Sequence, residues 1–452
     1  MTRTEPARGM RDYLPEDIRR REHVIGVIRR VYERYGFEPL ETPAVENLET
    51  LMGKYGEEGN QLIFKILKRG EHEASGQADL ALRYDLTVPL ARVVAQYQSK
   101  LPRLFKRYQI QPVWRADRPA RGRFREFYQC DVDSLGSTSP VIEAELCTAV
   151  SVALTELGFT DFHLRLNHRQ LLTEILDAAG VPAELHGSAL VALDKLDKIK
   201  IDGVSKEMSE RGISAAAIEA LTEVFTGRIA MDLVTGGPMA GLQSVADFVS
   251  RAGDVPASVE NLRRIFQLTE NTPAAGHLTF DPSLARGLSY YTGAIMEANV
   301  PDLAGSLGGG GRYDNLVGMF LGQSVPACGF SLGLERILVV MGERGMFPPN
   351  LTTTAADVML AVFDAADAPH ALRVAGLLRE AGLRVLVYPD ADKIGKQIKY
   401  ADSLGIPFVA ILGGNEIAAG TVTVKNLTAQ TQATYDQAAA GGAILEGLRQ
   451  RG

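Results

Sequence analysis

The sequence contains few cysteines, no long apolar run and no common nucleotide-binding glycine loop. Its three cysteines, Cys130, Cys147 and Cys328, form no Cys-x-x-Cys pair, which argues against a zinc site and for a reducing cytoplasm. It has no run of about 20 apolar residues, so we expect no membrane-spanning helix. No apolar segment follows residues 1–6, so they do not resemble a secretory signal. The absence of Gly-x-x-x-x-Gly-Lys-Ser/Thr and of a strand-to-helix Gly-x-Gly-x-x-Gly disfavours a kinase fold.

The overall composition is ordinary, but the local charge is not. Of 452 residues, 46% are hydrophobic and 23% are charged, and the length allows two or three domains. The net charge of -7 excludes a protein that is basic throughout. Within residues 103–125, however, the single acid Asp117 stands against Arg103, Lys106, Arg107, Arg115, Arg118, Arg121, Arg123 and Arg125. This basic stripe predicts a localised polyanion site, such as a nucleotide phosphate or an RNA end.

Two glycine-containing stretches carry arginine and tyrosine side chains close together. Residues 286–293 read Arg-Gly-Leu-Ser-Tyr-Tyr-Thr-Gly, and residues 306–314 read Ser-Leu-Gly-Gly-Gly-Gly-Arg-Tyr-Asp. Glycine lets a ligand approach the backbone closely, and the flanking side chains offer donors and aromatic surface. The pattern fits one pocket for an anionic group, lined by aromatic rings. It is equally compatible with two glycine-rich turns that join antiparallel strands.

Asp85 and Thr87 follow a strand-like run at residues 80–84 and precede an expected helix from about Pro89 to Ser99. Side chains of these types at a strand end are able to hold an ammonium group. They are also residues that cap helix N-termini, and capping is the simpler explanation when no other context is given.

A strand is expected over residues 124–133, after a basic loop that contains Pro119 and Gly122. Alternate residues of a strand share one face, which here would carry Arg125, Phe127, Gln129, Asp131 and Asp133. This set is unusual for a hydrophobic core and reasonable for a binding site. A solvated strand face is the competing explanation.

The pattern of elements changes along the chain. Helices are expected over residues 15–35, 143–157 and 169–179, and residues 182–272 show helical patterns only, for example at 183–199 and 215–225. Strands resume at His277, and a strand at 327–332 leads into a helix with Arg336 near its start, where the helix dipole disfavours a cation unless an anion lies opposite. Residues 355–452 alternate strand and helix, which predicts a small α/β domain with a mainly parallel sheet.

Taken together, these stretches resemble the histidyl-tRNA synthetases, a family of class II aminoacyl-tRNA synthetases, over nearly the whole chain apart from the helical segment. The segment from the first helix to Pro43 looks like class motif 1, and residues 114–133 and 329–336 look like motifs 2 and 3. Residues 286–293 and 309–314 are similar to the two histidine signatures, although Ser289 replaces the usual acid. Residues 396–401 and 420–425 resemble the family's anticodon-binding domain.

The resemblance implies an α+β catalytic domain with a mostly antiparallel class II sheet, a helical insertion and a C-terminal α/β anticodon-binding domain. The expected boundaries are a catalytic core in two parts at 1–181 and 273–342, a helical insertion at 182–272, a linker at 343–354 and an anticodon-binding domain at 355–452. It further implies a cytoplasmic homodimer that uses L-histidine, ATP with Mg²⁺, and tRNA(His), with no membrane partner and no metal ligands from the protein.

The family's site residues map onto this sequence as follows. Arg286 and Arg115 would stabilise charge on the α-phosphorus during adenylate formation. ATP would be bound by Arg115, Arg123, Phe127 and Arg336. Histidine would be bound by Asp85, Thr87, Gln129, Asp133, Tyr290, Tyr291 and Tyr313. Hydrogen bonds to both imidazole nitrogens reject analogues strongly, so we expect no separate editing domain.

A different class of function remains open. Synthetase-like regulatory subunits of ATP phosphoribosyltransferase share the catalytic core but usually lack the C-terminal domain and have degenerate histidine signatures. This chain has both features, which favours the catalytic interpretation. A pure RNA-binding module would not need the Arg-Tyr-Tyr pocket, and a class I synthetase fold is disfavoured by the missing glycine loops.

Overall fold

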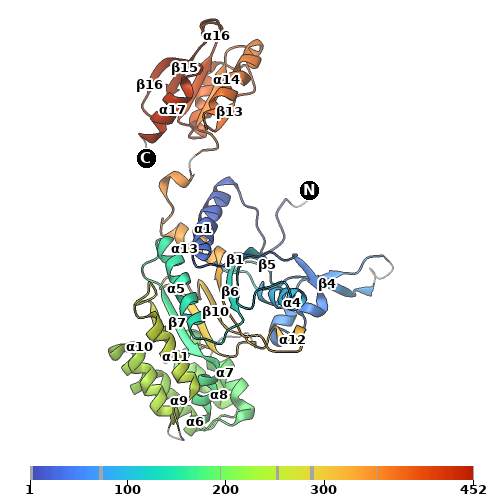
Figure 1. Ribbon diagram of the computed structural model, residues 1–452, viewed down its shortest axis with the longest axis vertical. Coiled ribbons are helices and arrows are strands. Elements are labelled where there is room, and N and C mark those ends of the chain that lie inside the picture. Colours follow the sequence, from blue (N-terminus) through green and yellow to red (C-terminus); the bar gives the residue numbers. More distant parts are fainter. Residues whose placement is uncertain are drawn as a thin grey trace. The chain divides into compact units, whose positions relative to one another are not determined.

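The computed structural model describes residues 4–70, 75–193, 195–250, 254–285, 290–352 and 354–450. The chain divides into two compact units, Met1–Met346 and Phe347–Gly452, which are described separately (Figure 1). None of the helices within these described residues is long and apolar enough to cross a membrane.

The first unit is organised around a sheet with the strand order β1-β5-β6-β11-β10-β9-β7-β8. The strands are β1 Glu38–Pro39, β5 Phe105–Trp114, β6 Glu126–Leu135, β7 His163–His168, β8 Leu278–Phe280, β9 Ala294–Asn299, β10 Gly308–Arg312 and β11 Ala327–Gly333. The two pairings at the sheet edges, β1 with β5 and β7 with β8, are parallel, and those between them are antiparallel. The expected mostly antiparallel sheet is confirmed.

The glycine run at 308–311 is part of an interior strand, so the alternative of a turn is wrong there. β10 pairs along its length with β11 and along most of it with β9. A Cβ atom at Gly310 would lie 2.0 Å from the Gly329 carbonyl oxygen, so the two backbones pack more closely than a side chain permits. The run therefore forms a side-chain-free surface inside the sheet.

Helices α1 Pro15–Arg34, α4 Thr87–Tyr97, α5 Val141–Glu156, α6 Arg169–Ala178 and α13 Leu334–Glu343 accompany this sheet. α1 packs on α5 and α13, and its apolar face includes the buried residues Ile25, Ile28 and Val31. α4 begins at Thr87, two residues before the predicted start at Pro89, because proline is tolerated in a first turn where its missing N–H has no partner to lose.

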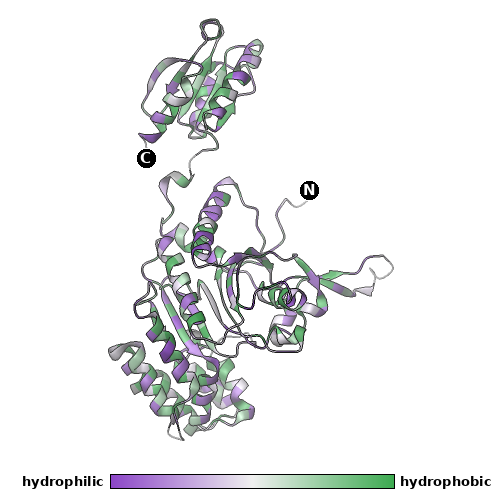
Figure 2. Ribbon diagram, viewed as in Figure 1, coloured by the Kyte–Doolittle hydropathy of each residue, from purple (hydrophilic) through white to green (hydrophobic). Residues whose placement is uncertain are grey.

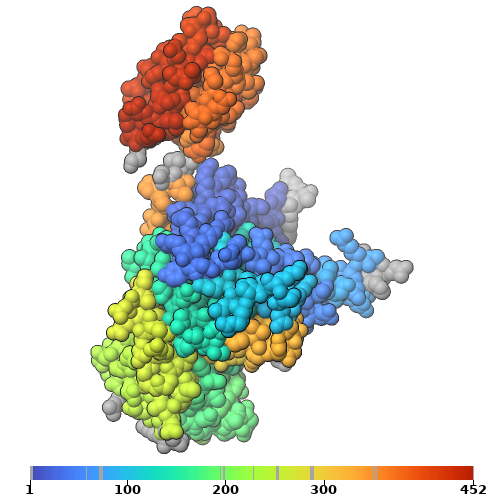
Figure 3. Space-filling view, viewed as in Figure 1, coloured from blue at the N-terminus to red at the C-terminus, as the bar shows by residue number. Residues whose placement is uncertain are grey.

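A small sheet in the order β2-β4-β3 extends from the first unit (Figures 1 and 3). Its strands are β2 Val45–Asn47, β3 Lys65–Leu67 and β4 Ala78–Leu82. Of the short helices in the first unit, α2 Leu48–Leu51 packs against β2 and β4, α3 Gly56–Gln61 follows it in the chain, and α12 Gly318–Leu321 packs against α4.

Residues 183–269 form helices only, within the part that the structure describes. They are η2 Ala183–Leu185, α7 His186–Leu193, α8 Leu196–Glu210, α9 Ala215–Thr226, α10 Arg228–Val249 and α11 Ala257–Thr269. The helical pattern expected at 183–199 is present as η2, α7 and the start of α8, and α8 contains one non-helical residue, Lys200, where φ is 58°.

The second unit contains a sheet in the order β13-β12-β14-β15-β16. Its strands are β12 Val358–Val362, β13 Val385–Val387, β14 Phe408–Leu412, β15 Thr421–Asn426 and β16 Thr431–Asp436. β12 pairs in parallel with β13 and β14, whereas β14, β15 and β16 pair antiparallel. The predicted mainly parallel sheet is thus corrected to a mixed sheet. β16 is largely exposed and lacks the apolar alternation that would have predicted it.

Both faces of this second sheet are covered by helices of the same unit. These are α14 Ala368–Glu380, α15 Ile394–Ser403, α16 Gly414–Ala419 and α17 Ala440–Arg449, with short 3-10 turns at Pro349–Thr352 and Ala365–Asp367. Alternate residues of β12 enter two different cores: Val358 and Leu360 pack with α14 and α17, and Met359 packs on the side of α15. β12 and β14 are accordingly apolar throughout (Figure 2).

Candidate functional site

A cavity of about 310 Å³ opens in the first unit, on the surface formed by β6, β10 and β11. The segment before α4, the loop between β5 and β6, and the first turn of α13 complete its wall. All of the predicted site residues that the structure describes line this cavity: Asp85, Thr87, Arg115, Arg123, Phe127, Gln129, Asp133, Tyr290, Tyr291, Tyr313 and Arg336. Arg286, the predicted catalytic arginine, lies outside the described residues.

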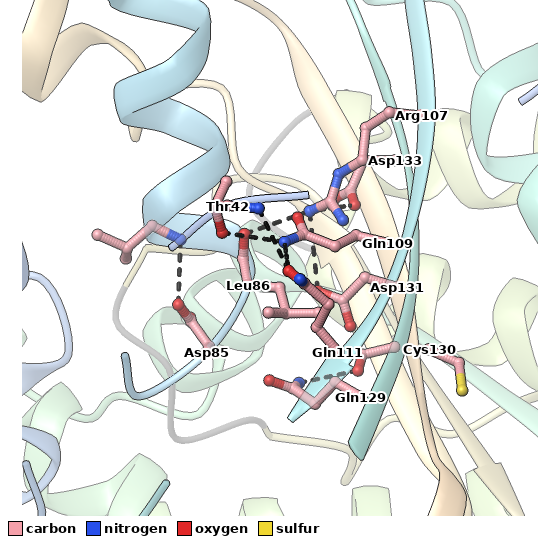
Figure 4. Close-up of polar contacts among 12 residues, drawn as sticks. Thr42, Asp85, Leu86, Arg107, Gln109, Gln111, Gln129, Cys130, Asp131 and Asp133 are labelled. Carbon is pink, nitrogen blue, oxygen red and sulfur yellow. Dashed lines mark hydrogen bonds and ion pairs between the residues drawn. The ribbon is translucent and has the colours of Figure 1, made fainter. Parts of the chain in front are cut away.

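β6 supplies one side of the cavity through its alternation. Phe127, Gln129, Asp131 and Asp133 line the cavity, whereas the Cys130 side chain points the other way (Figure 4). The predicted strand face is therefore present over these residues. Arg125 departs from it: the residue precedes β6, and its Nε donates a hydrogen bond to the Asp117 carbonyl oxygen at 3.0 Å.

One end of the cavity is acidic and deeply buried. Asp85, Asp131 and Asp133 are each at most 2% exposed. Asp85 accepts hydrogen bonds from the Val88 amide at 3.0 Å and from the Tyr55 hydroxyl at 2.9 Å. The capping and binding interpretations of Asp85 are therefore compatible, because one oxygen caps α4 while the residue also faces the cavity. Burial raises the pKa of Asp85 and Asp133.

Aromatic rings enclose this acidic end. The Tyr290 ring meets those of Tyr291 and Tyr313 edge to face, with centroids 5.0 Å and 6.0 Å apart. The Tyr313 hydroxyl donates a hydrogen bond to Asp133 Oδ1. Burial raises the pKa of the Tyr290 and Tyr313 phenols, so both remain neutral donors at ordinary pH.

The other end of the cavity carries three arginines. Arg115 is held by a hydrogen bond from its Nε to the Tyr84 carbonyl at 3.0 Å, and its guanidinium stacks 4.3 Å over the Tyr84 ring. Arg123, half exposed, pairs with Asp117 at 2.8 Å, and Arg336 in the first turn of α13 donates to the Ser306 carbonyl. Three guanidinium groups around one opening are suited to a polyphosphate.

Asp131, Ser331 and Glu335 also line the cavity, and none of them was among the predicted site residues. Asp131 was placed on the correct face, and Ser331 lies opposite it in the β6–β11 register. Glu335 accepts from the Tyr128 amide at 2.9 Å and the Tyr13 hydroxyl at 3.1 Å, and burial raises its pKa to about 7. Asp131 could have been identified from the sequence, because it alternates with Gln129 and Asp133. Ser331 could be identified only from the pairing of β6 with β11.

The cavity thus combines an acidic, aromatic pocket with a basic opening. An ammonium group and a small ring fit the first, and phosphate groups fit the second. A sheet of this order, with the site on its glycine-lined surface, is that of a class II aminoacyl-tRNA synthetase.

Comparison with known proteins defines the family. The family model for histidyl-tRNA synthetase matches residues 9–337, and that for an anticodon-binding domain matches residues 357–446. The chain belongs to the histidyl-tRNA synthetase family.

Its relatives match over nearly the whole length. The chain is 39% identical to a histidine--tRNA ligase from Christiangramia forsetii, over 97% of this chain and 98% of the relative. It is 41% identical to one from Porphyromonas gingivalis, over 93% and 94%. A solved histidyl-tRNA synthetase structure from Nostoc sp. PCC 7120 superposes with a TM-score of 0.80 at 29% identity, covering 99% of this chain and 100% of the other.

Proposed function

We propose that this protein is a histidine--tRNA ligase that activates L-histidine with ATP and transfers it to tRNA(His). The observation that carries the proposal is the union of an acidic, tyrosine-lined pocket and an arginine-lined opening in one cavity. Relatives named histidine--tRNA ligase, matched over nearly the full length, support the same reaction.

Histidine occupies the acidic end. Its ammonium group lies among Asp85, Thr87, Gln129 and Asp133, of which the two carboxylates and Gln129 are buried and so little screened by water. Its imidazole faces Tyr290, Tyr291 and Tyr313, whose hydroxyl groups are able to donate to or accept from the ring nitrogens. The ammonium group is common to all amino acids, so selection comes from the ring: a side chain without the imidazole nitrogens would leave the buried tyrosine hydroxyl groups unpaired.

ATP occupies the basic end. Phe127 stacks on the adenine, Arg123 and Arg336 hold the γ-phosphate, and Arg115 and Arg286 approach the α-phosphate. The histidine carboxylate attacks the α-phosphorus, a bond to the bridging oxygen breaks, and pyrophosphate leaves. A ribose hydroxyl at the tRNA end then attacks the carbonyl carbon, and AMP leaves. Donors fixed in advance around the phosphorus stabilise the charge that develops there.

Mg²⁺ enters as part of the nucleotide substrate. Of the carboxylates that line the cavity, Glu335 stands beside Arg336, but both of its oxygens already accept hydrogen bonds. Phosphate oxygens and water therefore supply most ligands, as Mg²⁺ commonly prefers. When bound, the ion neutralises charge on the phosphates.

The direct test is ATP–pyrophosphate exchange without tRNA, run against each of the twenty standard amino acids. Exchange with histidine alone is the expected result. No exchange with any amino acid, from folded protein, would overturn the proposal and favour a regulatory synthetase-like subunit. A structure described as such a regulatory subunit or a histidyl-tRNA synthetase, from Bacillus halodurans, shares the fold with a TM-score of 0.74, but at 20% identity that likeness concerns the fold alone.

We further propose that the protein acts in the cytoplasm as a homodimer joined through the motif 1 segment that begins with α1. Sedimentation equilibrium should then give twice the 48.9 kDa of one chain. A monomer with full charging activity would contradict this assembly.

Gly329→Ala is expected to raise the KM for histidine by about tenfold while the KM for ATP changes less than about twofold. Gly329 lies opposite Asp133 in the sheet, and a Cβ atom there would lie 1.9 Å from Asp133 Oδ1. The carboxylate must therefore move. Gly342→Ala is the matched control: it lies in α13, and nothing stands within 4 Å of its added Cβ, so both KM values should stay at wild type. An unchanged histidine KM in Gly329→Ala would contradict the role of Asp133.

Acidification from pH 8 to pH 6 is expected to raise the KM for histidine by up to about tenfold. Burial raises the pKa of Asp131 to about 7, with Arg107 opposing the shift and Asp133 adding to it. At lower pH this carboxyl is mostly protonated and no longer attracts an ammonium group. A raised carboxyl pKa means that the folded chain binds the proton more tightly than the unfolded chain, so acidification through this range stabilises the fold through Asp131. Protonation of Asp131 therefore does not unfold the protein, and unfolding does not explain the expected rise in the KM for histidine.

Free histidine also titrates in this range, so the control is the same pH series with Asp131→Asn. That variant retains the titration of the substrate and of Glu335, whose pKa burial also raises to about 7, but removes that of Asp131. The difference between the two series isolates Asp131, and superimposable series would show that Asp131 does not titrate near the substrate.

A further inference from the structure

Arg107 is a buried cation directly behind the acidic end of the cavity. It lies on β5, its side chain is 0% exposed, and it is not among the residues that line the cavity. Its Nη2 lies 2.9 Å from Asp133 Oδ2 and 3.8 Å from Asp131 Oδ2 (Figure 4). The same nitrogen donates to the Leu86 carbonyl oxygen at 3.3 Å.

These contacts connect the two halves of the proposed ammonium site. Leu86 stands between Asp85 and Thr87, which line the cavity from the segment before α4. Asp131 and Asp133 line it from β6. A single guanidinium thus fixes the α4 segment relative to the β6 carboxylates.

The hydrogen bonding of this cluster is too incomplete for a strongly stabilising ion pair. Within the described residues, Arg107 Nε and Nη1, Asp131 Oδ1 and Asp133 Oδ2 are buried without a hydrogen-bond partner, since the short contact to Asp133 lacks hydrogen-bond geometry. A buried ion pair repays its desolvation only when its geometry is good and its remaining polar atoms are satisfied. A contribution to stability therefore does not explain why an arginine is buried here, whereas a role in substrate binding does.

The positive charge of Arg107 affects the ionisation of Asp131 and Asp133. Two carboxyl groups that share a buried site tend to retain a proton between them, which leaves one of them neutral. A cation behind the pair favours the charged form of both and leaves the front of the cavity open to the substrate.

We propose that Arg107 is a positioning residue for histidine recognition, which holds Asp131 and Asp133 ionised and aligned with the Asp85–Thr87 segment to receive the substrate ammonium group. The inference rests on the proposed function. It assigns to Arg107 an effect on histidine affinity and none on ATP affinity, since Arg107 contacts residues of the acidic end only.

The test is a double-mutant cycle measured by ATP–pyrophosphate exchange. Arg107→Met should raise the histidine KM by about 10- to 100-fold, with the ATP KM within about twofold of wild type. Adding Asp131→Asn should raise the histidine KM little beyond that of Arg107→Met, because the charge that Arg107 maintains on Asp131 is already lost and the two effects are not additive. If Arg107 acted independently of Asp131, the two single effects would multiply, so a double variant that shows their product would overturn the proposal.

Arg107→Lys keeps the charge in case the methionine variant does not fold. Lysine is a point charge without the guanidinium fork, so it cannot contact Leu86 and both carboxylates together. The histidine KM should rise about three- to tenfold, again without an effect on ATP. Unchanged histidine KM, or an equal rise in both KM values, would overturn the proposal.

Arg92→Met is the matched control. Arg92 on α4 pairs with the buried carboxylate of Glu46 at 2.7 Å and does not line the cavity. It should lower thermal stability and leave the histidine KM unchanged. Failure of the wild-type protein to exchange with histidine would instead count against the proposed function, which separates the two hypotheses.

Discussion

Arg115→Ala is expected to lower the rate of histidine-dependent ATP–pyrophosphate exchange by about 100- to 1000-fold while the protein stays folded. The Arg115 guanidinium is fixed in advance by its hydrogen bond to the Tyr84 carbonyl and by stacking on the Tyr84 ring, at 5.2 Å from the Phe127 ring centre. A donor that is already oriented stabilises charge on the α-phosphorus without reorganisation during the reaction. Its loss should therefore act on kcat more than on either KM.

Arg118→Ala is the control for this experiment. Arg118 belongs to the same basic stripe, but its side chain is exposed and does not line the cavity. Its removal changes the net charge by the same amount and should leave exchange at the wild-type rate. Arg115→Ala exchange within a few fold of wild type would refute the catalytic role, and equal losses in both variants would point to a general electrostatic effect.

Removal of residues 347–452 is expected to lower kcat/KM for tRNA charging by about 10²- to 10⁴-fold and to leave pyrophosphate exchange within a few fold of wild type. The cavity is lined entirely by residues of the first unit. The removed unit has its own core on each face of its sheet, made of residues between Ala356 and Leu448. Its matched anticodon-binding model predicts that it contributes RNA affinity but not adenylate chemistry.

An acceptor minihelix without the anticodon arm provides the control. The full-length and shortened proteins should charge it equally, because neither gains from a second contact. An equal loss of exchange and charging would contradict the separation of the two activities, and thermal denaturation of the shortened protein shows whether its fold persists.

Local periodicity predicted much of the site. The shared face of Phe127, Gln129, Asp131 and Asp133 follows from the two-residue repeat of any strand, and neighbouring residues suffice to recognise it. The start of α4 was less accurate, because Pro89 within its first turn resembled a boundary. Asp85 was assigned two competing roles, and the structure shows that its position serves helix capping while it faces the cavity.

Strand pairing was beyond local analysis. The glycines at 308–311 were compatible with a turn until their partners on β9 and β11 were known. β16 escaped notice because its polar, exposed residues carry no apolar alternation, and without it the second sheet was expected to be mainly parallel. Pairing partners lie far apart in sequence, so no local pattern specifies them.

The arginines of the basic stripe at residues 103–125 also differ in position in a way that the sequence did not predict. The sequence assigned all of its arginines to one polyanion site. In the structure Arg115 and Arg123 face the cavity, Arg121 pairs with Glu343 on the surface, and Arg107 is buried behind the acidic end. The direction of each side chain depends on its strand, its loop and the element opposite.

The sequence by itself determined the family, the mostly antiparallel sheet and the residue types of the site, because motifs and periodicities are properties of neighbouring residues. Only the tertiary structure decided that Gly329 leaves room for the Asp133 carboxylate and that Arg107 stands behind that same carboxylate. The physical reason is that burial, charge balance and steric room arise between segments that meet only after the chain has folded.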